Sequence, residues 1–102
     1  MQARWRGTVI ADSDRTRRVE GNHYFPHEDV AWEHLRRSGT VSVCPWKGRA
    51  DYYDLEVGGA SVPDVAWEYR RPFPWARFIR GRVAFWGGVE VVEVSDFPAD
   101  SV

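Results

Sequence analysis

Cysteine and lysine each occur once in the chain, as Cys44 and Lys47, three residues apart in the segment 43–48 (Val-Cys-Pro-Trp-Lys-Gly). A positive charge beside a thiol favours the thiolate, which is a nucleophile and a soft metal ligand. His23, in the earlier segment 21–26, could act as the base that takes the thiol proton. The residue types therefore predict a catalytic set of Cys44, Lys47 and His23. The alternative is that Cys44 is a small buried apolar side chain and Lys47 a solvated turn residue.

Aromatic residues elsewhere in the chain suggest a binding pocket around this segment. Ligand pockets are mostly apolar, with a few polar groups that fix the orientation of the ligand. We expect Lys47 to meet an anionic group of a small ligand, and aromatic rings to stack on its flat or apolar portion. The residues that we assign to ligand binding are Tyr24, Trp46, Lys47, Tyr52, Trp67 and Tyr69. In the alternative, these rings form the core of a small domain.

Other site chemistries have less support in the sequence. His23, His27 and Cys44 are conceivable metal ligands, but the closely spaced cysteine pairs of structural zinc sites are missing, so we expect no metal and no cofactor. The sequence also has no glycine-rich loop of the kind that holds a nucleotide phosphate. The loop 72–75 (Pro-Phe-Pro-Trp) holds two aromatic residues between or beside prolines, and tryptophan is a common anchor at interfaces. A protein-interaction module that uses this loop is therefore an alternative function.

The apolar pattern predicts strands over most of the chain, because apolar and polar residues alternate at period 2. The expected strands lie at 4–10, 17–20, 41–44, 53–57, 60–62, 65–70, 82–86 and 89–94. We expect 4–10 to form a hairpin with 17–20, and tight hairpin turns at Gly58-Gly59 and Gly87-Gly88. The alternation also places Val41 and Val43 toward the main core and Cys44 on the opposite face.

One short α-helix is expected near residues 27–37. Pro26 can begin it, acidic residues occupy its first turn, and Arg36 and Arg37 lie at its end, as the helix dipole favours. The predicted fold class is therefore mainly β, or α+β by content, with a single antiparallel sheet domain and this helix. The tail 95–102 is expected to be loosely held.

Length and charge limit the classes of function. A chain of 102 residues fits one domain, 1–102, because two separate cores would each be too small. A formal net charge of −1 argues against general nucleic-acid binding, and no apolar run is long enough to cross a membrane. The lone cysteine and the absence of a signal-peptide pattern favour the cytoplasm. We expect a small-molecule ligand as partner, and the chain to be a monomer or a homodimer.

Several motifs, taken in order along the chain, resemble the family known as domain of unknown function 427, which is sometimes labelled nucleotidyltransferase-like. The matching segments are 21–26 (Gly-Asn-His-Tyr-Phe-Pro), 44–48 (Cys-Pro-Trp-Lys-Gly), Tyr52-Tyr53, 66–69 (Ala-Trp-Glu-Tyr) and 83–85 (Val-Ala-Phe). The resemblance implies a compact, mostly β domain, similar in topology to the β-tent folds of zinc-binding and methionine sulfoxide reductase proteins. The family label implies nucleotidyl transfer as a further alternative function.

Overall fold

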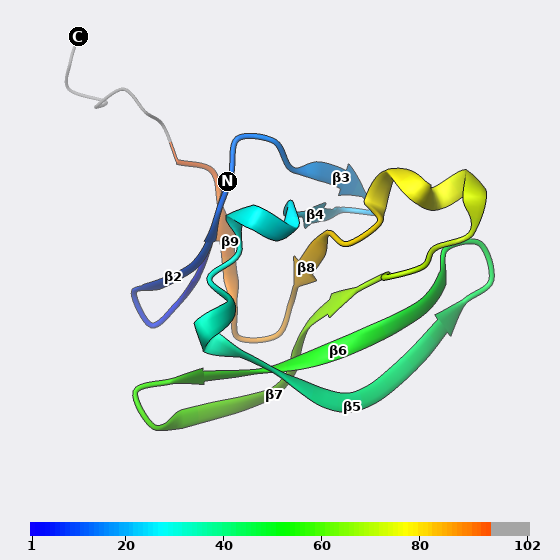
Figure 1. Ribbon diagram of the computed structural model, residues 1–102. Helices are drawn as coiled ribbons and strands as arrows, with labels where there is room; N and C mark the ends of the chain where they lie inside the picture. The colour runs from blue at the N-terminus through cyan, green and yellow to red at the C-terminus, as the bar shows by residue number, and fades with distance from the viewer. Residues whose placement is uncertain (95–102) are drawn as a thin grey trace, which may run out of the picture.

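The computed structural model describes residues 1–94 and consists of strands joined by short turns (Figure 1). The strands are β1 (Gln2–Trp5), β2 (Thr8–Asp12), β3 (Arg17–Val19), β4 (Asn22–Tyr24), β5 (Leu35–Cys44), β6 (Gly48–Val57), β7 (Ala60–Glu68), β8 (Val83–Phe85) and β9 (Glu90–Val92). Three 3-10 helices lie between them: η1 (His27–Asp29), η2 (Trp32–His34) and η3 (Pro74–Ile79). Within these residues no helix has the length and apolar character needed to cross a membrane.

The largest sheet has the strand order β5-β6-β7-β8, and all its neighbouring strands are antiparallel. Gly58 and Gly59 form the turn between β6 and β7 with φ angles of 56° and 83°, which glycine adopts without steric cost. The predicted hairpin at this turn is confirmed, as is the mainly β, antiparallel fold class. In Figure 1 the long strands β5, β6 and β7 form one layer, with the shorter strands and η3 beside it.

The four-stranded sheet separates two apolar cores. Along β6, Tyr53 and Leu55 belong to the larger core, whereas Ala50 and Tyr52 belong to or pack against the smaller one. This division follows from strand geometry, because successive side chains point to opposite faces of a sheet. The other buried members of the larger core are Ala3, Trp5, Ile10, Ala11, Phe25, Val30, Val65, Ala66, Val83, Phe85 and Val89. The smaller core contains Tyr24, Ala50, Tyr69, Ala76, Ile79 and Ala84.

The two remaining sheets correct the predicted pairing of the chain ends. Strand β1 pairs with β2 and with β9, while β3 pairs with β4, so the expected hairpin between 4–10 and 17–20 is wrong. The turn at Gly87-Gly88 exists, but it joins two sheets, because β8 pairs with β7 and β9 pairs with β1. All three residues of β8 are buried, because Val83 and Phe85 belong to the larger core on one face of the sheet and Ala84 belongs to the smaller core on the other.

The α-helix expected near 27–37 is also wrong. The chain there forms η1 and η2, and β5 already begins at Leu35. Between the two turns the chain pairs with β2, through a bridge from Val30 to Ala11 and a hydrogen bond of 2.8 Å from the Ala31 amide to the Ile10 carbonyl oxygen. An isolated helix of this length is marginal, so these longer-range contacts determine the local conformation. The tail 95–102 lies outside the described residues.

Candidate functional site

Lys47 lies in the turn between β5 and β6 with a side chain that is almost completely buried. Its ammonium forms an ion pair with Glu20, in the turn between β3 and β4, and lies 5.4 Å from the ring centroids of Trp46 and Tyr69. Burial alone would lower the pKa of Lys47, but the hydrogen bond to Glu20 raises the net pKa above its ordinary value. The same bond lowers the pKa of Glu20. The lysine is thus charged, enclosed and already paired, rather than a solvated turn residue.

The aromatic residues predicted to bind a ligand do come together, on the face of the sheet that holds the smaller core. Tyr24 packs against Trp67 and Tyr69 with ring centroids 6.3 and 6.4 Å apart, and Tyr52 lies 6.3 Å from Trp67. The indole of Trp67 donates a hydrogen bond of 3.2 Å to the Tyr24 hydroxyl. Cys44 is half-buried and packs against the same core. These rings therefore pack against one another and pair their polar atoms, as residues of a core do.

The side-chain directions in β5 differ from the prediction. Val41 and Val43 are 42% and 72% exposed and do not face the main core. The reason is that β5 is an edge strand. Of its residues, only Leu35, at the start of the strand, packs against the larger core. Cys44 lies at the far end of this strand, where it contacts the smaller core.

His23 and Trp46 lie at the margins of this cluster. His23 precedes Tyr24 in β4, so its side chain points to the opposite face, where Nδ1 lies 2.9 Å from the Thr16 hydroxyl. Burial, followed by the charge of Arg18, lowers the pKa of His23. Trp46 is 37% exposed. The structure thus gathers Cys44 with the rings but directs His23 elsewhere.

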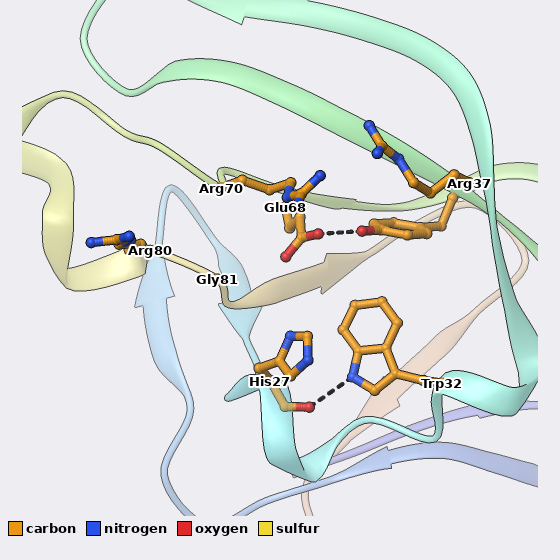
Figure 2. A pocket seen from close by; sticks show the side chains of 8 residues that line it. His27, Trp32, Arg37, Glu68, Arg70, Arg80 and Gly81 are labelled. Atoms are coloured by element: carbon orange, nitrogen blue, oxygen red, sulfur yellow. Dashed lines mark hydrogen bonds between the residues drawn. The ribbon is translucent and has the colours of Figure 1, made fainter.

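A cleft of about 440 Å³ opens on the other face of the sheet. No local motif reveals this cleft, because its lining comes from separate parts of the chain. The lining residues are His27, Trp32, Arg37, Tyr53, Glu68, Arg70, Arg80 and Gly81. Figure 2 shows His27 and Trp32 on one side of the space, and Glu68, Arg70 and Arg37 on the other. The cleft thus places an aromatic wall opposite a wall of charged groups.

The inner end of the cleft contains a buried polar pair. Tyr53 and Glu68 are 6% and 4% exposed, and the Tyr53 hydroxyl donates a hydrogen bond to Glu68 Oε1. Burial, followed by the Glu68 hydrogen bond, raises the pKa of Tyr53 above its ordinary value. Trp32 packs edge-on against Tyr53 with centroids 5.3 Å apart, and its indole nitrogen donates 2.9 Å to the His27 carbonyl oxygen. These contacts hold the rings of Trp32 and Tyr53 in position.

Arginines dominate the charge of this region. A second hollow of about 260 Å³ shares Arg37 and Arg70 with the cleft and is also lined by Arg49, Asp51 and Arg71. Asp51 forms ion pairs with Arg37 and Arg49, at 3.3 and 3.5 Å. Within residues 1–94, no ion pair involves Arg70, Arg71 or the cleft residue Arg80. The combined surface therefore carries five guanidinium groups against the two carboxylates of Asp51 and Glu68, which makes its formal charge positive.

A family model described as Domain of unknown function (DUF427) matches residues 1–96, which include both the Cys44 cluster and the arginine-lined cleft. The chain belongs to this family. The resemblance seen in the motifs is thereby confirmed, and it extends over nearly the whole chain. A comparison with curated proteins gave no match. Among the residues that the structure describes, no three His, Cys, Asp or Glu side chains are grouped so that they could hold a metal ion.

Sequence reasoning missed the cleft because its residues are ordinary when taken singly. Glu68 was the one available signal: it is a carboxylate on the same face of β7 as Ala66, which belongs to the larger core. The expected helix over 27–37 also hid the role of Trp32, which reaches Tyr53 only because the chain forms two short turns.

Proposed function

We propose that this DUF427 domain binds a small anionic ligand with a flat ring in the arginine-lined cleft. The observation that carries the proposal is that the cleft lined by Trp32 also contains two guanidinium groups without ion pairs within residues 1–94, those of Arg70 and Arg80. Guanidinium groups recognise carboxylates and phosphates with paired hydrogen bonds. A cleft of about 440 Å³ suits a ligand of one or two rings.

The ligand class is the one expected from the sequence, but the proposed position differs. A ligand at the Cys-Pro-Trp-Lys-Gly segment would have to displace Glu20 from Lys47 and separate rings that pack on one another. The arginine-lined cleft requires neither change. If the ligand binds in the arginine-lined cleft, the Lys47–Glu20 ion pair stays intact and links the two turns in which these residues lie.

Calorimetric titration with phenyl phosphate, inorganic phosphate and benzyl alcohol tests the proposal. Phenyl phosphate combines a ring with an anion, so we expect it to bind more tightly than either of the other two probes. The Arg80→Ala variant should weaken this binding about tenfold or more, since a hydrogen bond to a charged group contributes about 1.5–3 kcal/mol. Arg77→Ala is the matched control, because Arg77 lies in η3, which ends immediately before Arg80, but does not line the cleft. Equal affinity of the two variants for phenyl phosphate would contradict the proposal.

A second candidate function is partner docking at the Pro-Phe-Pro-Trp loop. Phe73 and Trp75 are 38% and 65% exposed, and their rings stack with centroids 5.2 Å apart. The Trp75 indole donates a hydrogen bond of 2.6 Å to the Trp46 carbonyl oxygen, which holds this exposed pair in position. A partner that binds the wild type and the Trp75→Ala variant equally would exclude this loop as its docking site.

A further inference from the structure

Glu68 is a buried carboxylate with an incomplete set of partners. Its residue exposure is 4%, and the Tyr53 hydroxyl reaches only Oε1. Within residues 1–94 no guanidinium group lies within ion-pair distance of either oxygen. A carboxylate has about four acceptor positions, so most of the accepting capacity of Glu68 is unused by the protein.

The second oxygen of this carboxylate is accessible from the cleft. In the described part of the chain, Asp64 Oδ1 is the one buried side-chain atom that lacks a partner, so Glu68 Oε2 is not sealed in the interior. Glu68 lines the cleft, and Figure 2 shows one of its oxygens joined by a dashed line to its partner while the other points away from that bond. A group bound in the cleft can therefore donate to Oε2.

The surroundings decide which donor suits this oxygen. Arg37, Arg70 and Arg80 line the same cleft, and their positive charges disfavour an additional cation. A neutral N–H donor avoids that repulsion and still forms a charge-assisted hydrogen bond with the carboxylate. Trp32 lies across the space from Glu68 (Figure 2), so a ring that packs against Trp32 occupies the same cleft as the carboxylate.

We propose that Glu68 makes the cleft selective for anionic heterocycles that carry a neutral ring N–H donor, over rings of equal charge that lack one. This inference rests on the proposed anion-binding function and assigns the ring-recognition step to Glu68. A ligand without the donor leaves the buried carboxylate short of a partner, which costs binding free energy. The arginines hold the anionic group of the ligand, and Glu68 discriminates between rings.

A matched pair of probes isolates this step. Orotate and 1,3-dimethylorotate have the same ring and the same carboxylate, but only orotate has N–H donors. We expect orotate to bind the wild-type protein about tenfold more tightly or better, as a hydrogen bond to a charged group implies. In Glu68→Gln the ratio of the two affinities should fall about fivefold or more, because the neutral amide is a weaker acceptor. Loss of the Glu68 charge changes the affinity of both anionic probes by the same factor. The ratio of the two affinities therefore reports only the hydrogen bond to the ring.

Two further measurements separate recognition from a merely structural role of Glu68. Tyr53→Phe keeps the carboxylate, so the preference for orotate should persist even if stability falls. In the wild-type protein, orotate should shift the carboxyl ¹³C resonance of Glu68, and the dimethyl compound should not. This measurement does not depend on whether a Glu68 variant folds. A ratio that is the same in wild type and Glu68→Gln, or an unshifted resonance, overturns the inference.

The same titrations distinguish failure of the inference from failure of the proposed function. If both probes bind equally to the wild-type protein and both weaken in Arg80→Ala, the cleft binds anions but Glu68 does not select the ring. If neither probe binds, or if Arg80→Ala leaves both affinities unchanged, the anion-binding function itself is wrong and the inference fails with it.

Discussion

Tyr52 and Tyr53 are adjacent in β6, yet their hydroxyl groups lie on opposite faces of the sheet and in different surroundings. The Tyr53 hydroxyl is buried and donates to Glu68. The Tyr52 hydroxyl is solvent-exposed and lies 3.0 Å from the Ser42 hydroxyl. Replacing each tyrosine by phenylalanine removes the same single oxygen atom, so the pair of variants compares two environments at constant chemistry.

The expected effects differ because only one variant leaves a buried charged group without its donor. Tyr53→Phe removes the hydrogen bond to a carboxylate that is 4% exposed, which should lower the free energy of unfolding by about 1.5–3 kcal/mol. In Tyr52→Phe, water can replace the lost contact with Ser42, so the change should stay within about 0.5 kcal/mol.

Urea denaturation followed by tryptophan fluorescence measures both variants, with the slope of the transition as a check that unfolding remains two-state. For a domain of this size, the expected loss in Tyr53→Phe corresponds to a decrease in Tm of roughly 6–24 °C. Equal destabilisation by the two substitutions, or a larger effect of Tyr52→Phe, would refute the assignment of Tyr53 and Glu68 as a buried pair.

The pH dependence gives an independent check on Tyr53. Its pKa in the folded protein is raised above the ordinary value of about 10, chiefly by burial and by the hydrogen bond to Glu68. The folded state therefore holds the phenolic proton more tightly than the unfolded state. This contribution is fully present below about pH 10 and is lost as the pH rises further, so the stability difference between wild type and Tyr53→Phe should shrink in that range.

Three further predictions concern the other face and the surface. Because Lys47 lowers the pKa of Glu20, the stabilisation from their pair is present above the ordinary glutamate pKa of about 4.3 and is lost on acidification; the stability difference between wild type and Glu20→Gln should fall with pH, and a constant difference contradicts this. Trp75→Ala should cost less than about 1 kcal/mol and Phe85→Ala about 3–5 kcal/mol, measured by urea denaturation, since the first side chain is 65% and the second 4% exposed; similar costs would be unexpected. The half-buried Cys44 should react with a disulfide reagent more slowly than free cysteine and speed up in urea, whereas a rate equal to that of free cysteine would count against its packing in the smaller core.

Local patterns predicted the parts of the fold that depend on neighbours in the sequence. The hairpin at Gly58-Gly59 and the strand character of most segments follow from glycine conformation and alternation alone. Longer-range pairing was harder to predict. The turn at Gly87-Gly88 has the composition of a hairpin, but the strands on its two sides find partners elsewhere, and the Ala31 amide bonds to Ile10 instead of continuing a helix.

The same distinction applies to the site. The sequence grouped Cys44 and its aromatic neighbours, and their rings are indeed close in space, because alternation along β6 and β7 directs them to one face. Whether these rings line a pocket or pack tightly against one another depends on side-chain packing, which the alternation of apolar and polar residues does not predict. Trp32 and Glu68 are far apart in the sequence, and only the folded chain brings them to one cleft.

The assignment of adjacent residues in β6 to opposite cores limits how the length of this chain can change in evolution. Inserting or deleting one residue within the strand would exchange its two faces from that point on, so that Tyr52 and Tyr53 would trade surroundings. Relatives should therefore gain or lose residues in the turns at 45–47 and Gly58-Gly59, where the chain leaves the sheet, and keep the interval between these turns constant. A fixed count of residues along β6, even where the residues themselves differ, would be the evolutionary trace of a sheet with a separate apolar layer on each side.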